Sequence, residues 1–329
     1  MTRRAVTPVV VAMAVAALAL VGEPDGAGSA SAGQKAATDK TGRSFTARIR
    51  VDWVDHRGRH DTTLDVQAAG GLVQVDGVAP GGGPVVLGDG WLMVARPGEG
   101  FAVAAATERK YDVAREPGPQ IAGRPTGLVT LRSKQVVRER LAVDDDTGLV
   151  LRRELFGADG RAVRVVTVTE LDTSPPPQAL AKGERRLAPD NATRLRPEAL
   201  ERPYAAPATL AGGYERVAAF RRGSVVHLLY SDGLHGLSVF MQPGRLDRDR
   251  LPDGGRPAAV TGADARRFSW AGGEIVTWES GPVVRTVVGD AAPDEVMAAA
   301  RSLPPASELS ALGRLRRASR QVAEVLSGG

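Results

Sequence analysis

The N-terminal half of the chain contains stretches in which apolar and polar residues alternate. In the first of these the alternating apolar positions are Phe45, Ala47, Ile49, Val51 and Trp53. A period of two places them on one face of a strand, with the polar residues between them on the other face. A polar turn follows at residues 56–60, and the alternation resumes at Leu64, Val66 and Ala68. The pattern therefore predicts two successive strands that share one buried face.

Further along, turn residues stand between apolar runs. Asp89-Gly90, the segment Asp144–Gly148 and Asp159-Gly160 each separate two such runs. Asp-Gly suits the positive φ angles of a tight hairpin turn. The region up to residue 172 is therefore predicted to form a mostly antiparallel sheet, strongly curved or half closed so that its apolar face is protected.

Prolines interrupt the pattern between residues 173 and 209 and predict a linker there. Beyond it, apolar runs at 225–230 and 234–241 flank a turn, and runs at 274–278 and 283–288 form a second pair. Pro293 followed by two acidic residues predicts the start of a helix that ends near residue 303. These elements predict a second, smaller α+β domain.

Both ends of the chain carry separate signals. Arg3 and Arg4 precede an apolar run from Val9 to Val21, and Ala30-Ser31-Ala32 offers a cleavage site before Gly33. This order is typical of a secretory signal peptide, and the alternative is an uncleaved anchor. At the other end, Ser307 is expected to cap an amphipathic, Arg-rich helix, which is either a solvated face or a surface for anionic lipid.

Composition excludes several kinds of function. The 329 residues include no cysteine, which excludes disulfides, thiol catalysis and thiolate metal sites. There are 43 lysines and arginines against 38 acidic residues, giving a net charge of only +5. This is weak evidence for nucleic-acid binding, and export argues against it.

Residues with catalytic or metal-binding potential occur, but not in a productive pattern. His56 and His60 lie in a glycine-containing turn, where a spacing of four does not create a zinc site. His227, Ser231, Asp232 and His235 contain the residue types of a hydrolase triad, yet they surround one hairpin turn and the chain has no Gly-x-Ser-x-Gly sequence. We therefore expect no catalytic residues, no metal site and no cofactor.

Several motifs resemble the MucB/RseB family of extracytoplasmic regulators of sigma-E-type factors. The segments that carry the resemblance are 121–125 with 129–131, 144–148 with 151–153, 210–214, and 229–234 with 237–240. The most specific is Leu229-Tyr230-Ser231-Asp232-Gly233-Leu234, which is similar to the signature of the family's second domain. The match in order and spacing covers about residues 44–303.

The resemblance implies an α+β protein whose first domain is a curved antiparallel half-barrel similar to the lipoprotein carrier LolA, followed by a smaller α+β domain. Together with the patterns above it predicts a signal peptide at 1–32, a flexible leader at 33–43, the half-barrel at 44–172, the linker at 173–209, the second domain at 210–303, and the Arg-rich helix at 304–329.

The resemblance also implies a non-catalytic function outside the cytoplasm. The protein would bind the extracytoplasmic segment of a single-pass anti-sigma factor, shield that segment from regulated proteolysis, and be released by a lipid or lipoprotein signal. The alternative is a lipid or lipoprotein carrier that uses the cavity of the first domain. No nucleic-acid partner is expected.

Two groups of residues are the candidates for binding. The lipid-facing wall of the first domain would comprise Trp53, Leu64, Trp91, Met93 and Phe101, which could equally fill a dry core. The second-domain surface for the protein partner would be shaped by Tyr230, Asp232 and Leu234, although Asp232-Gly233 also fits ordinary turn chemistry.

Overall fold

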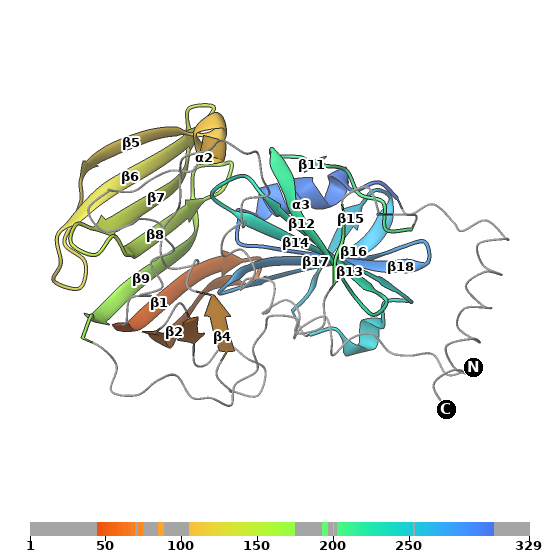
Figure 1. Cartoon of the computed structure of the whole chain (residues 1–329), viewed down its shortest axis with the longest axis horizontal. Coiled ribbons are helices and arrows are strands. Elements are labelled where there is room, and N and C mark those ends of the chain that lie inside the picture. Colours follow the sequence, from red (N-terminus) through yellow and green to blue (C-terminus); the bar gives the residue numbers. More distant parts are fainter. Residues whose placement is uncertain are drawn as a thin grey trace.

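The computed structural model describes residues 45–69, 72–75, 85–88, 105–174, 193–196, 200, 203–252 and 254–305. Within them the chain forms two large antiparallel sheets that lie side by side (Figure 1). The predicted signal peptide, the leader, most of the linker and the C-terminal helix lie outside the described residues. Among the described helices, none has the length and apolar character needed to cross a membrane.

The first sheet has the strand order β4-β3-β2-β1-β9-β8-β7-β6-β5, and each neighbouring pair is antiparallel. Its strands are β1 (Phe45–Asp55), β2 (Gly58–Ala69), β3 (Leu72–Val75), β4 (Val85–Gly88), β5 (Asp112–Pro117), β6 (Thr126–Ser133), β7 (Val136–Asp144), β8 (Val150–Phe156) and β9 (Ala162–Asp172), with helix α2 (Ala105–Lys110) before β5. The terminal strands β4 and β5 do not pair with each other, so the sheet is curved but open (Figure 1).

The alternation in the sequence explains which face of this sheet is buried. Phe45, Ala47, Ile49 and Val51 are buried, and Leu64 of β2 joins them in one apolar cluster. The β1–β2 register pairs Ile49 with Leu64, as expected for strands that share a buried face. The predicted β1–β2 hairpin is therefore confirmed.

The acidic segment after β7 forms the predicted turn. Asp144 accepts hydrogen bonds from the backbone N–H and the hydroxyl of Thr147, and Gly148 adopts a φ of 69°, which favours glycine. The Asp144 carboxylate also accepts from Nε of Arg124 at 3.0 Å. The turn is thus held by hydrogen bonds from two parts of the first sheet.

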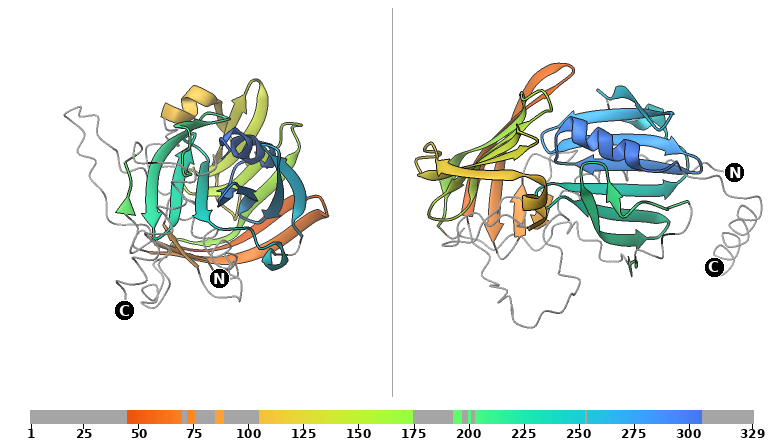
Figure 2. Two further views of the ribbon diagram at one scale, coloured as in Figure 1. Left: turned by 90° about the vertical axis from the view of Figure 1, so that its right-hand side faces the viewer. Right: turned by 90° about the horizontal axis from the view of Figure 1, so that it is seen from above.

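The second sheet follows the order β10-β12-β13-β14-β18-β17-β16-β15, with β11 paired to β12. Its strands are β10 (Thr193–Arg194), β11 (Thr209–Leu210), β12 (Tyr214–Arg222), β13 (Val225–Ser231), β14 (Gly236–Pro243), β15 (Arg256–Val260), β16 (Ala263–Trp270), β17 (Gly273–Ser280) and β18 (Val283–Gly289); a short 3₁₀ helix, η3 (Arg248–Arg250), precedes β15. Helix α3 (Pro293–Ser302) lies in the hollow of this curved sheet (Figure 2).

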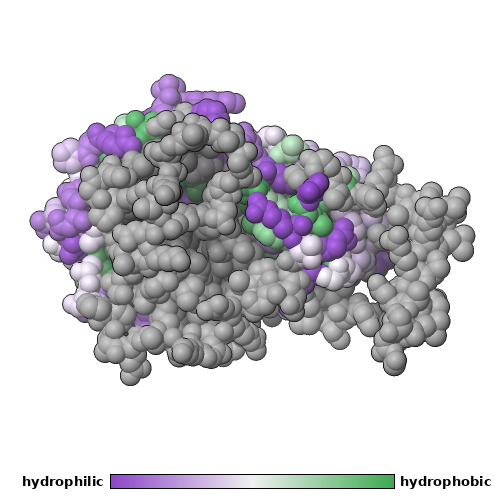
Figure 3. All heavy atoms as spheres, viewed as in Figure 1, coloured by the Kyte–Doolittle hydropathy of each residue, from purple (hydrophilic) through white to green (hydrophobic). Residues whose placement is uncertain are grey.

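Helix α3 forms where the sequence predicted it. Pro293 occupies the first turn with Asp294 and Glu295, and the helix ends before Leu303. Its buried residues pack on the sheet to form the larger core, together with Trp278 of β17, Tyr214 of β12 and Leu237 of β14. The visible described surface carries mainly hydrophilic side chains, with a few hydrophobic ones over the second sheet (Figure 3).

The predicted α+β class is wrong, because the described residues are mostly β-strand. The apolar runs indicated four strands in the second domain, whereas the structure also forms β12, β15 and β16 there. These strands are rich in arginine and alanine, and they lie toward the edges of the sheet, so their sequences lack a clear apolar period. The first sheet is an open antiparallel sheet, which agrees with the predicted strand direction.

Candidate functional site

Buried charged and polar side chains gather where the first sheet meets the second. We call this cluster the joint. The first sheet and helix α2 before it contribute Lys110, Tyr111, Arg138, Glu139, Arg153 and Arg164. The second sheet and α3 contribute Tyr214, Asp232, His235, Asp290, the exposed Asp294 and Glu295. Burial of so many charges is costly unless each is paired, so the geometry of the pairs decides what the joint can do.

The centre of the joint is His235, which is 1 % exposed and follows the turn between β13 and β14. Its Nε2 lies 3.1 Å from a carboxylate oxygen of the fully buried Glu139 of β7, and its Nδ1 lies 3.6 Å from Asp232. Burial alone would lower the pKa of His235, but the two carboxylates outweigh it and raise the pKa to about 10. The imidazole is therefore a buried cation at neutral pH.

Glu139 is shared between the two sheets. It pairs with Arg153 of the neighbouring strand β8 as well as with His235. Burial alone would raise the pKa of Glu139, yet Arg153 and His235 lower it to about 2. Glu139 is thus an ionised carboxylate between one cation from each sheet.

Asp232 shows how the β13–β14 turn reaches into the first sheet. One carboxylate oxygen accepts from Nζ of Lys110 at 2.5 Å and from the hydroxyl of Tyr111 at 2.9 Å. The other accepts from the backbone N–H of Leu234 at 2.9 Å and of His235 at 2.7 Å. Burial opposes ionisation, but hydrogen bonds and the charges of His235 and Lys110 lower the pKa of Asp232 well below its usual range.

The first turn of α3 forms a second group of contacts. Glu295 accepts from Nζ of Lys110 at 3.0 Å, from the hydroxyl of Tyr214 at 2.7 Å and from Arg138 at 2.9 Å. Arg138 also reaches Asp294 at 3.1 Å. Acidic residues in the first turn of a helix are favoured by the helix dipole, and here they also bind two cations of the first sheet.

The third group surrounds Asp290, between β18 and α3. Its carboxylate accepts from Arg153 at 3.2 Å and from the backbone N–H of Gly236 at 2.9 Å. Its backbone carbonyl accepts from Arg164 of β9, which is 7 % exposed. Burial and the neighbouring Arg153 lower the pKa of Arg164 to about 10.

Asp232, His235 and Glu295 are close enough for one atom of each to approach a common metal ion. However, the ammonium of Lys110 already contacts both Asp232 and Glu295. Since a charged lysine supplies the cation these carboxylates need, the described residues favour a protein ion network over a metal centre.

The structure places the predicted protein-binding residues in or beside the joint. Tyr230 is 1 % exposed and donates from its hydroxyl to the Pro207 carbonyl at 2.8 Å. Asp232 is buried as described above, and Leu234 is partly buried against an apolar cluster of the first sheet. These three residues therefore contact the protein itself, and their contact with a partner stays a prediction.

The predicted lipid-facing wall is described only in part. Leu64 is buried in the apolar cluster of the first sheet, and the partly buried Trp53 packs against that cluster and stacks on His60. Trp91, Met93 and Phe101 lie outside the described residues. For the two residues that the structure describes, packing within the protein accounts for their burial.

The residue types of a hydrolase triad do not form one here. The hydroxyl of Ser231 donates to the backbone carbonyl of His235 at 3.1 Å, whereas the imidazole of His235 faces Glu139 and Asp232. His227 is stacked on Phe240 with ring centroids 4.2 Å apart, and burial lowers its pKa to about 3. Contacts within the protein therefore account for the positions of these side chains.

Sequence reasoning missed most of the joint. Lys110, Glu139 and Asp290 are far apart in the chain and belong to no recognisable motif, whereas Arg153 lies in a segment that carries the family resemblance but was given no role. The available signal was a run of three charged residues, Arg138-Glu139-Arg140, between apolar residues of one strand. A charged residue at an inward strand position has to be paired, but the sequence does not identify the partner.

The joint makes stability depend on pH. Because the pKa of His235 is raised from 6.5 to about 10, its contribution is complete below pH 6.5 and is lost as the pH rises toward 10. Because the pKa of Glu139 is lowered from 4.5 to about 2, its contribution is complete above pH 4.5 and is lost as the pH falls toward 2. We expect the thermal unfolding midpoint to be highest between about pH 5 and 6.5.

Thermal scans from pH 3 to 10 measure this dependence. In His235→Gln the decline between pH 6.5 and 10 should become shallower, while His56→Gln, in an exposed turn, should retain the decline of the wild type. An unchanged alkaline decline in His235→Gln would contradict the pairing of His235 with the two carboxylates.

The fold and the joint together define a mostly β, two-sheet protein whose sheets are held together by buried ion pairs. Comparison with known families finds a match over part of the chain: residues 74–189 match the model of the MucB/RseB N-terminal domain. The predicted resemblance to this family is confirmed. Among curated proteins, none matches this chain.

Three solved structures are similar to the chain at low identity. A MucB structure in complex with MucA(peri) is 20% identical, with a TM-score of 0.45, and the match covers 80% of this chain and 94% of that one. A structure of MucB alone is 20% identical, with a TM-score of 0.46, and the match covers 80% of this chain and 92% of that one. The Pseudomonas aeruginosa MucA/MucB complex is 18% identical, with a TM-score of 0.40, and the match covers 80% of this chain and 94% of that one.

Proposed function

We propose that this protein is a non-catalytic regulator that acts outside the cytoplasm. It binds the extracytoplasmic segment of a single-pass anti-sigma factor and shields that segment from regulated proteolysis. The observation that carries this proposal is the match of residues 74–189 to the MucB/RseB N-terminal domain. In that family MucB has been solved with MucA(peri), and we infer a partner of the corresponding kind here.

The chain organisation that belongs to this proposal is the one expected from the sequence. Export is through the signal peptide at 1–32, and the binding regions are 44–172 and 210–303, joined by the linker. The joint supports a binding function because it fixes one sheet against the other, so that a partner meets a preorganised surface. Preorganisation reduces the entropy that binding has to overcome.

Extended peptides bind sheet proteins by adding a strand to a free edge or by lying along a face. β5 ends the first sheet, and five of its six residues are exposed. A lipid or lipoprotein signal would release the partner, and Trp53 and Leu64 are the described members of the proposed lipid-facing wall. Stoichiometric lipid without a protein partner would instead identify a carrier.

The test is capture from detergent-solubilised membranes of the source organism, using tagged residues 33–329 and mass spectrometry of protein and lipid. A single-pass protein with a cytoplasmic sigma-binding domain should be retained. Bound lipid in the absence of such a protein would contradict the regulatory function and would favour the function of a lipid or lipoprotein carrier.

A variant of the joint makes this test specific. Asp232→Ala removes the carboxylate that binds Lys110 and Tyr111 and should reduce capture at least tenfold, because the sheets lose their fixed arrangement. Asp159→Ala, in an exposed turn, should capture the partner like the wild type. Equal capture by both variants would show that the joint does not support partner binding.

A further inference from the structure

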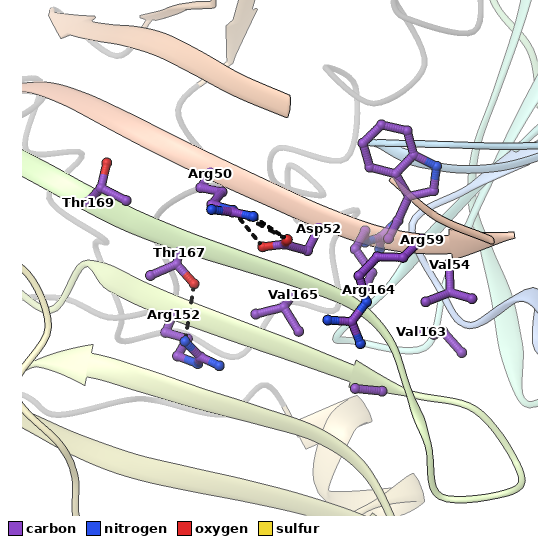
Figure 4. Close-up of a pocket in the computed structure, with 12 residues that line it drawn as sticks. Arg50, Asp52, Val54, Arg59, Arg152, Val163, Arg164, Val165, Thr167 and Thr169 are labelled. Atoms are coloured by element: carbon purple, nitrogen blue, oxygen red, sulfur yellow. Dashed lines mark hydrogen bonds and ion pairs between the residues drawn. The ribbon is translucent and has the colours of Figure 1, made fainter. Parts of the chain in front are cut away.

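A shallow groove runs along the face of the first sheet opposite its buried apolar cluster. Its volume is about 330 Å³, and its lining comes from β1, β2, β8 and β9. Arg50 and Asp52 of β1 lie beside Thr167 of β9 and Arg152 of β8 (Figure 4). None of these residues takes part in the joint except Arg164, which lines the groove and also donates to Asp290.

The length of the groove suits an extended chain. Val163, Val165, Thr167 and Thr169 alternate along β9 and all line it. The six steps from Val163 to Thr169 span about 20 Å at roughly 3.4 Å per residue. A volume of about 330 Å³ spread over this length leaves a channel about one side chain wide, whereas a compact anion would fill only one part of it.

The lining has an excess of positive charge, with four arginines and one aspartate. Arg50 pairs with Asp52 at 3.1 Å, and Arg152 pairs with Glu154 at 2.8 Å. Within the described part of the chain, Arg59 has no carboxylate within ion-pair distance, and the side chain of Arg152 is 38 % exposed. Arg164 is buried and donates to the backbone carbonyl of Asp290, so Arg59 and Arg152 are the guanidinium groups that carboxylates of a ligand can reach.

Apolar positions lie between these charges. Val54 is 41 % exposed, although it belongs to a strand whose other face is the core. It lines the groove together with Val163 and Val165. The surface thus alternates guanidinium, hydroxyl and methyl groups at the spacing of a strand, which matches a peptide with acidic and small apolar side chains.

We propose that this groove binds an extended acidic segment of the protein partner. The inference rests on the proposed function for the identity of that partner, but the groove itself can be tested separately. The peptide lies along β9, with its carboxylates at Arg59 and Arg152 and its small side chains against the valines. Binding is electrostatic in part and therefore weakens as salt increases.

The direct test is fluorescence anisotropy with a labelled eight-residue peptide in which glutamate alternates with valine or threonine. The double variant Arg59→Gln/Arg152→Gln should bind it at least tenfold more weakly than the wild type. Arg48→Gln is the matched control, because Arg48 lies on the same face of β1, pairs with Asp65 and Glu170, and does not line the groove. A peptide with glutamine in place of glutamate should bind weakly to all of them.

Equal affinity of the double variant and the wild type would overturn the proposal, as would equal binding of the glutamine peptide. Groove-dependent binding of phosphatidylglycerol vesicles or inorganic phosphate, with no binding of the peptide, would overturn it in favour of a phosphate ligand.

Membrane capture separates this proposal from the proposed function. If the wild type and the double variant retain the partner equally, the proposed regulatory function is supported and the proposed binding of the partner in the groove is overturned. If no partner is retained, the proposed regulatory function is contradicted. The anisotropy result then decides by itself whether the groove binds an acidic peptide.

Discussion

Glu139→Ala is expected to lower the free energy of unfolding by about 3–5 kcal/mol, since removing one partner of a buried ion pair leaves the other charge uncompensated. Here two cations, Arg153 and His235, lose their shared carboxylate, and His235 is 1 % exposed. Urea unfolding followed by circular dichroism at pH 6 measures the effect. At this pH the wild-type joint is fully charged.

The matched control is Glu154→Ala on the neighbouring strand β8. Glu154 also pairs with an arginine, Arg152, but at the sheet surface, where such a pair contributes about 0–1 kcal/mol. A loss in Glu139→Ala as small as that in Glu154→Ala would show that the joint is not an important source of stability. Glu139→Gln should fall between the two, because it keeps the shape but not the charge.

Trp278→Ala is expected to cost about 3–5 kcal/mol of unfolding free energy through a cavity in the second core. Trp278 of β17 is fully buried in the cluster that packs beneath α3. Its indole N–H has no hydrogen-bond partner among the residues that the structure describes, so Trp278→Phe loses volume without breaking one of these bonds and should cost much less.

The same urea titration tests this prediction, with Val217→Ala as the control. Val217 of β12 is 37 % exposed, and its truncation should change stability by less than about 0.5 kcal/mol. A similar loss in Trp278→Ala and Val217→Ala would contradict the packing of α3 on this core.

The strands that were predictable from the sequence are those with one apolar and one polar face. β1 is the clearest case, because its odd-numbered residues from Phe45 to Val51 are buried, while Arg48, Arg50 and Asp52 between and after them form surface ion pairs. β12 and β16 could not be predicted in the same way. Their sequences place arginines among small apolar residues, and their strand character comes from pairing with better-defined neighbours.

For the joint, the sequence indicated only which types of residue are present near the β13–β14 turn, and not which residues they contact. Ser231-Asp232-Gly233 has the composition of an exposed hairpin turn, and it does form a turn in which Gly233 has a φ of 90°. Nothing local indicates that Asp232 will meet Lys110 and Tyr111 from another sheet. Ion pairs between distant segments depend on tertiary packing, which the pattern of a single strand or turn does not contain.

Of the sequence observations, the family resemblance led to the most detailed predictions about function. The motif around Tyr230 forms the turn through which the second sheet contacts Lys110 and Tyr111, whereas its predicted role in binding a partner stays a prediction. The buried positions of Tyr230 and Asp232 explain why these residue types are needed for the structure itself.

Under the proposed function, the protein binds and shields the extracytoplasmic segment of an anti-sigma factor. The most direct measurement adds purified residues 33–329 to the purified segment and follows its cleavage by the protease that makes the first regulated cut. We expect a stoichiometric complex and at least tenfold slower cleavage, with protection lost in Asp232→Ala. Cleavage at the same rate with and without the protein would contradict it.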